Sequence, residues 1–213
     1  MKICINKTKT FKNIMKVFYK QKSSDYQRCE ESGTDLGQLL TKEKTIAAMK
    51  SLDGDLDKAL GRISGGLYVV TASQGSGESQ RRSAMVASWV SQASFTPPGI
   101  TVAVAKDRAV EALLHKGDCF ALNVLAEGRE TGLMKQFLQP FEPGANRFVG
   151  LELETSPGDQ PLLPDALAWL EGSVKQRMEC GDHWLIYAEV LHGGLFDADG
   201  HTAIHHRRSG ANY

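Results

Sequence analysis

The sequence predicts a mainly β protein, a closed antiparallel barrel with helices at its periphery. The first observation behind this prediction is a series of short apolar segments that are separated by turn residues. The second is that few helical patterns lie between these segments, without the regular alternation of strand and helix that marks a parallel sheet. The third is the composition, because 41% of the 213 residues are hydrophobic and 23% are charged, as in a globular domain with a core.

Three segments are expected along the chain. Residues 1–24 are rich in lysine and contain no acid, which predicts a frayed, solvated terminus, with a weak basic amphipathic helix as the alternative. Residues 25–52 contain too few large apolar side chains for a domain and are interpreted as a linker with one or two short helices. Residues 53–213 are expected to form the globular domain.

The domain is expected to begin with a helix over residues 55–63, which Asp55 caps and which places Leu56, Leu60 and Ile63 on one face. Gly65-Gly66 would end that helix. The run LYVVTAS then predicts a strand, and the glycine-rich QGSGESQ predicts a hairpin loop. That loop is not a P-loop, because it lacks Gly-Lys-Ser/Thr and no helix follows it.

The stretch SAMVASWVSQASFTPP, residues 83–98, predicts one strand of small hydroxyl and apolar residues that ends in a double-proline turn. A second strand, ITVAVA, follows and ends at Lys106 and Arg108. Hydroxyls and free backbone N–H groups beside two cations favour a planar, anionic ligand. The alternative is that these side chains are merely solvated.

The serines of this stretch would divide between two faces if the strand is regular. Because strand side chains alternate, Ser88 and Ser94 would share one face and Ser83 and Ser91 the other.

The remaining elements are several short strands and two short helices. The first helix, AVEALLHK, would turn Val110, Leu113 and Leu114 inward, and the second lies around GLMKQFL. A loop rich in turn residues, PFEPGANRF, follows the second helix. The expected strands are CFALNVL, Leu167–Leu170, Ser173–Glu179, His183–Leu191 and Ala203–His206.

Histidines offer two further candidate sites. Gly181-Asp182-His183 precedes an apolar strand and is either a simple turn or a place where His183 faces a cleft. The C-terminal histidines, with two nearby aspartates, are a weak candidate for a metal site, because His205 and His206 are adjacent and would point in opposite directions. No metal is therefore expected.

Charge, hydropathy and cysteine usage limit the function further. Lys plus Arg and Asp plus Glu both number 25, which disfavours a nucleic-acid partner. No apolar run approaches the roughly 20 residues that a membrane span needs. The four cysteines are scattered and form no CxxC, so a reduced, cytoplasmic setting is expected. A GxSxG elbow is also missing, which weakens a hydrolase interpretation.

Five segments together resemble the flavin reductase-like family, whose fold is the FMN-binding split barrel. They are LYVVTAS, SAMVASWVSQASFTPPGITVAVAKDR, GDCFALNVL, NRFVGLELE and GDHWLIYAEV. The phrases ASWVSQASF, GRISGGLYVVTA and VAKDRA are similar to the C-terminal reductase module of cyanobacterial-type flavodiiron (diflavin) proteins. Residues 26–50 resemble the end of the flavodoxin-like domain of those proteins and its linker.

The resemblance implies an NAD(P)H:flavin oxidoreductase with FMN, or FAD, as cofactor. Met85, Val86, Ala87, Ser88 and Trp89 would line the flavin, while Ser94, Lys106 and Arg108 would bind its phosphate. His183 would lie near the flavin and the nicotinamide as the catalytic residue. A homodimer is implied, and flavodiiron partner subunits are conceivable. The alternatives are a non-catalytic FMN-binding fragment, an electron-transfer module that needs partner domains, a related split-barrel protein for haem or a pyridoxal-type ligand, and a structural module.

Overall fold

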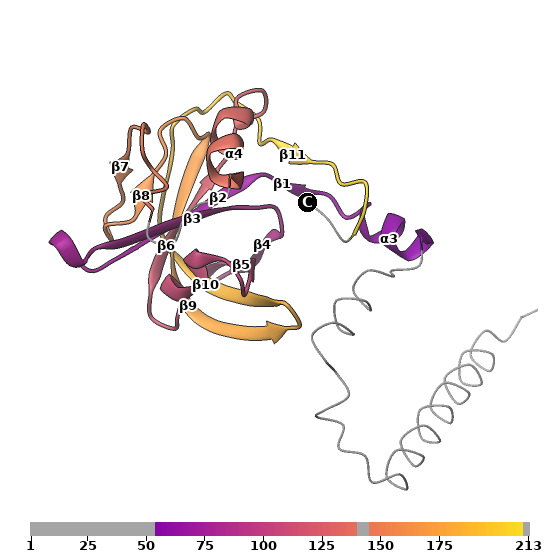
Figure 1. Cartoon of the computed structure of the whole chain (residues 1–213), viewed down its shortest axis with the longest axis horizontal. Coiled ribbons are helices and arrows are strands. Elements are labelled where there is room, and N and C mark those ends of the chain that lie inside the picture. The colour runs from indigo at the N-terminus through magenta and orange to yellow at the C-terminus, as the bar shows by residue number, and fades with distance from the viewer. Residues whose placement is uncertain (1–53, 140–144, 211–213) are drawn as a thin grey trace, which may run out of the picture. The chain divides into compact units, whose positions relative to one another are not determined.

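The computed structural model describes residues 54–139 and 145–210. The predicted segments 1–24 and 25–52 lie outside the described residues. The described residues from Asp55 to Gly210 belong to one compact unit, built mostly of antiparallel strands. Figure 1 shows these strands wrapped around one another, with α4 lying against them.

The strands form one main sheet and two short ladders. The main sheet contains β2 (Tyr68–Gln74), β3 (Arg81–Ala87), β4 (Val90–Phe95), β5 (Pro98–Ala105), β6 (Cys119–Val124), β9 (Ala168–Cys180) and β10 (His183–Leu195). The ladders join β1 (Gly65–Gly66) to β11 (Ile204–His205) and β7 (Glu154–Thr155) to β8 (Pro161–Leu162). The described helices are α3 (Gly54–Leu60), α4 (Glu130–Leu138) and the 3-10 turns η1 (Gly77–Ser79) and η2 (Ala109–Leu113).

The connection between β3 and β4 closes the barrel. The main sheet has the order β3-β2-β6-β9-β10-β5-β4, so β3 and β4 lie at its opposite ends. Only Ser88 and Trp89 separate these two strands in the chain, and the sheet must therefore curl until its ends meet. At this corner the N–H of Ala103 in β5 donates to the carbonyl of Trp89 at 3.0 Å. The predicted mainly β barrel with peripheral helices, of the split-barrel type, is confirmed.

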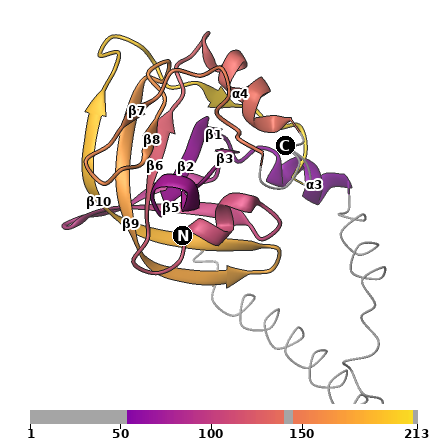
Figure 2. The ribbon, with the colours of Figure 1, turned by 60° about the vertical axis from the view of Figure 1, so that its left-hand side comes forward.

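Two apolar clusters lie on opposite faces of the β2–β3 hairpin, as the strand period of two requires. Val70 and Met85 belong to the cluster inside the barrel, together with Phe120 of β6. Val69 and Ala84 point the other way and join the cluster that also contains the buried side chains of α4. Helix α4 thus covers the outer face of this hairpin, beside the segment that the sequence singled out (Figure 2).

Several predicted elements are confirmed and others differ. The hairpin loop, η2 with its buried apolar side chains, β6 and α4 lie where the sequence predicted them. The single strand over residues 83–95 is wrong, because the chain turns at Ser88–Trp89 and the register shifts again between Gln92 and Ser94. Ser83 is therefore buried while Ser91 is exposed, so they share no face.

Three further corrections concern glycines and helix ends. Gly65–Gly66 forms β1, and α3 already ends at Leu60. The apolar side chains of residues 56, 60 and 63 are exposed in the described chain, so that face packs on no core. The two strands predicted over residues 167–179 are one strand, β9, which continues through Gly172.

Candidate functional site

A pocket lies between strand β3 and helix α4, at the end of β5. Seven residues line it: Met85, Val86, Ala105, Arg108, Phe137, Leu138 and Arg147. The apolar members come from β3, β5 and α4, while both charged members are arginines. The pocket therefore combines an apolar wall with two positive charges, which suits a flat ligand that carries an anionic group.

Arg147 is the more deeply placed of the two arginines. Its Nη1 donates to the carbonyl of Ala84 at 2.6 Å, and its Nη2 donates to the carbonyl of Phe137 at 3.0 Å. Burial lowers the pKa of Arg147, and the charge of Arg108 lowers it further. The two guanidinium groups repel each other, and a bound anion would relieve that repulsion.

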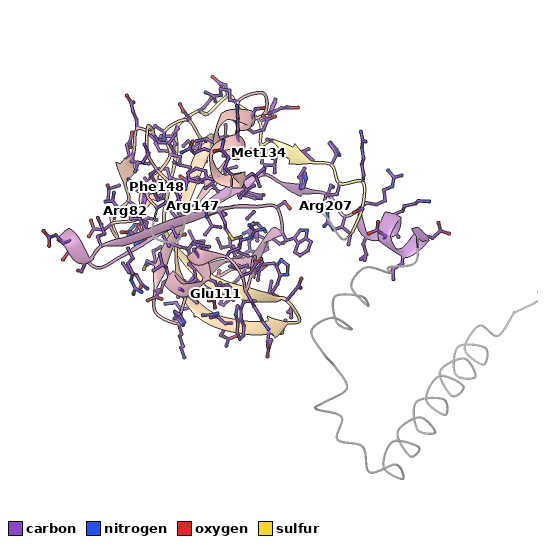
Figure 3. The ribbon with its side chains drawn as sticks, in the orientation of Figure 1. Arg82, Glu111, Met134, Arg147, Phe148 and Arg207 are labelled. Atoms are coloured by element: carbon purple, nitrogen blue, oxygen red, sulfur yellow. The ribbon has the colours of Figure 1, made fainter. Side chains whose placement is uncertain are left out.

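The sequence predicted three of the seven pocket residues and missed the second of the two charged ones, Arg147. Met85, Val86 and Arg108 were assigned to the ligand site, and the fold brings them together. Arg147 lies 63 residues from Ala84 along the chain, beyond the end of α4. Figure 3 labels its side chain. The segment NRFVGLELE pointed to the family, but nothing in its local pattern separates Arg147 from an exposed loop arginine.

The Ser88–Trp89 corner contains one buried hydroxyl, the Oγ of Ser88, that has no hydrogen-bond partner among the described residues. Ala87 is fully buried in the barrel core, and neither its side chain nor its backbone is exposed. Ser88 is 2% exposed, and its Oγ has no hydrogen-bond partner. A Cβ at Gly65 would stand 2.2 Å from the carbonyl oxygen of Ser88, so only glycine fits in β1 opposite this corner. A buried hydroxyl without a partner is costly, which favours a ligand that would satisfy it.

His183 lies beside this corner at the start of β10. Its ring centroid is 5.0 Å from that of Trp89, with the ring planes inclined by 43°. Its Nδ1 is 2.8 Å from Oδ1 of Asp182, and this hydrogen bond is the main cause that lowers the pKa of Asp182. The His183 side chain is only 13% exposed, and its buried Nε2 has no hydrogen-bond partner in the described structure. Asp182 therefore orients the imidazole, and Nε2 can bond to a ligand.

The other two residues predicted to bind phosphate lie elsewhere. The Nζ of Lys106 pairs with the carboxylate of Glu179 and lies 5.2 Å from the ring centroid of Trp184. Ser94 is half-buried in β4, where its carbonyl accepts a bond from Gln92 at 3.4 Å. Neither lines the pocket.

The described residues contain no group of three or more His, Cys, Asp and Glu side chains that could hold a metal ion. Within the same ranges, no helix has both the length and the apolar character to cross a membrane.

Residues 60–212 match the family model described as the flavin reductase like domain. Among curated proteins, the chain is 54% identical to diflavin flavoprotein A 1 of Synechocystis sp., over 94% of this chain and 34% of that protein. It is 53% identical to the putative diflavin flavoprotein A 3 of Nostoc sp., over 88% of this chain and 32% of that protein. The chain thus spans about a third of the length of these relatives.

Solved structures show the same fold. A putative oxidoreductase from Sinorhizobium meliloti superposes with a TM-score of 0.63 at 27% identity, covering 74% of this chain and 52% of that one. The NADH:FAD oxidoreductase of Streptomyces globisporus superposes with a TM-score of 0.62 at 24% identity, covering 81% of this chain and 94% of that one.

Proposed function

Because the chain belongs to the flavin reductase-like family, we propose that it binds a flavin between β3 and α4 and reduces it with NAD(P)H. The observation that carries this proposal is the pocket in which Met85 and Val86 meet the guanidinium groups of Arg108 and Arg147. The family match supports flavin oxidoreductase chemistry. The apolar and charged lining of the pocket supports a flavin site between β3 and α4.

The two arginines would bind the flavin phosphate. Arg147 is held by its bonds to two backbone carbonyls, so its guanidinium is already oriented when a ligand arrives. Arg108 is about half-exposed and could move toward the same anion. FMN presents one terminal phosphate to such a pair, and FAD presents a diphosphate; we propose FMN as the preferred cofactor.

The corner at Ser88–Trp89 would receive polar edges of the flavin. The unpartnered Oγ of Ser88 could hydrogen-bond there. A bound flavin would supply the redox chemistry by accepting hydride from the nicotinamide. The chain itself would orient the two ligands, exclude water and offer Nε2 of His183 as a hydrogen-bonding group beside them.

A second candidate function follows from the length of the relatives. Proteins about three times as long as this chain carry the matching segment, so the domain could be an FMN-binding electron-transfer module that depends on partner domains. In either case we propose a homodimer in the cytoplasm, with flavodiiron subunits as conceivable partners. The two functions differ in turnover, because only the reductase oxidises NAD(P)H rapidly with free flavin as the acceptor.

The test uses the full chain. Purified protein is titrated with FMN and with FAD while flavin fluorescence is followed, and NADH and NADPH oxidation is then measured at saturating flavin. Flavin binding with rapid turnover supports the reductase. Binding with slow turnover supports the electron-transfer module. Absence of flavin binding at micromolar protein overturns both.

A further inference from the structure

The C-terminal tail, residues 204–210, is fastened to the start of the domain. The N–H of Gly210 donates to Oδ1 of Asp57 in α3 at 2.8 Å. Arg207 donates from Nη2 to the carbonyl of Gly210 at 2.7 Å, so its guanidinium is fixed within the tail. A Cβ at Gly61 would meet the backbone of Ser209 at 2.8 Å, which shows how closely the tail passes.

Arg207 also reaches the candidate site. Its guanidinium carbon lies 4.9 Å from the ring centroid of Trp89, within the range of a cation–π contact. The same ring contacts His183 at a centroid distance of 5.0 Å, and Nδ1 of that imidazole is 2.8 Å from Oδ1 of Asp182. Figure 3 labels Arg207 on the side of the domain that carries β1, β11 and α3.

We propose that Arg207 is a positioning residue that holds the Trp89 ring against His183 and so fixes the wall beside which the nicotinamide binds. This inference rests on the proposed function of the site. The backbone of Trp89 is already fixed, because its carbonyl accepts the N–H of Ala103. The planar guanidinium of Arg207 over the indole restricts rotation about the side-chain bonds of Trp89.

A purely structural role for Arg207 predicts a different experimental outcome. If the residue only anchored the tail, its loss would lower stability and leave the indole and imidazole where they are. Arg208 provides a matched control, because it is adjacent, carries the same charge and is exposed. The variants are therefore Arg207→Met, Arg207→Lys and Arg208→Met, each checked for an unchanged far-UV circular dichroism spectrum.

The first readout is ligand-free NMR of the full chain. The three tryptophans, Trp89, Trp169 and Trp184, give separate indole N–H signals, and Trp89→Phe assigns the first. Arg207→Met should shift or broaden the Trp89 and His183 ring signals and leave the other two indoles unchanged. Arg207→Lys should restore them in part, and Arg208→Met should move none. Wild-type positions for Trp89 and His183 in Arg207→Met would overturn the proposal.

The second readout separates binding from turnover. At saturating flavin, Arg207→Met should lower kcat with NAD(P)H by roughly two- to fivefold, the size expected from one cation–π contact at a partly exposed site, with an unchanged KM for flavin. An NMR change with wild-type kinetics would overturn the positioning role. If wild type shows no turnover, the proposed function fails, and the NMR comparison alone decides whether Arg207 orders Trp89.

Discussion

Arg147 donates from Nη1 to the carbonyl oxygen of Ala84 at 2.6 Å, which ties the chain after α4 to strand β3. Ala84 directly precedes Met85, a residue of the pocket wall. One side chain thus holds the pocket together and supplies part of its positive charge. Loss of Arg147 should therefore affect both stability and flavin binding, whereas loss of Arg108 should affect flavin binding alone.

Arg108→Met and Arg147→Met should both weaken flavin binding, each by about ten- to a hundredfold, because each removes a charge-assisted bond to phosphate. Only Arg147→Met should also lower the free energy of unfolding, by about 1–3 kcal/mol, because the carbonyls of Ala84 and Phe137 lose their donor. Flavin titration and urea unfolding measure the two effects, with Arg208→Met as the control. Wild-type flavin affinity in both pocket variants would contradict the assignment.

Lys106→Met tests one of the two phosphate ligands that the sequence predicted and that lie outside the pocket. Its Nζ is engaged by Glu179 and lies over Trp184, so we expect flavin affinity to fall by less than about threefold, as for a remote screened charge. The same titration as for Arg108→Met decides the question. A loss as large as that of Arg108→Met would return Lys106 to the phosphate site.

The strand pattern was largely predictable, because half-buried segments such as LYVVTAS show their burial in their composition. The break at Ser88–Trp89 was not predictable, because it contains neither glycine nor proline and arises from β3 pairing with β2 while β4 pairs with β5. At Gly172 the sequence predicted a break between two strands, but β9 continues through this residue. A Cβ there would stand 3.1 Å from Cβ of Ala188, so this glycine permits close strand packing and does not end β9.

The candidate site was predictable only in its contiguous part. Met85, Val86 and Arg108 belong to one segment whose chemistry could be interpreted locally. Arg147 lines the same pocket through tertiary structure alone. Lys106 does not line it, because its Nζ pairs with Glu179 of β9 and lies near the ring of Trp184 of β10. Contacts between residues that lie far apart in the chain cannot be predicted from local sequence patterns.

Gly158→Ala should destabilise the domain by about 2–4 kcal/mol. A Cβ at this position would stand 1.9 Å from Oε1 of Glu171, whose side chain is 1% exposed and accepts the N–H of Gly158 at 3.0 Å. The carboxylate has no solvent to move into, so either the turn or the buried charge must shift. Urea unfolding measures the loss.

Gly132→Ala is the matched control for that glycine. It lies in α4 with nothing within 4 Å of an added Cβ, so alanine should leave stability unchanged or raise it by up to about 1 kcal/mol. Equal effects of the two substitutions would contradict the clash at Gly158.

His205 should make the stability of the domain fall with acidification. Burial lowers the pKa of His205, and the charges of Arg207 and His206 lower it further, below the ordinary value of 6.5. The unfolded chain then binds a proton at a higher pH than the folded chain does, so stability that is fully present above about pH 6.5 is lost as the pH falls through the folded pKa.

His205→Gln should flatten this decline in stability. Arg207→Met should flatten it less, because it removes the charge of Arg207 and leaves the burial of His205 in place. Urea unfolding between about pH 7.5 and pH 5 measures the slopes, with the exposed His206→Gln as the comparison. A decline that persists unchanged in His205→Gln would show that another group controls it.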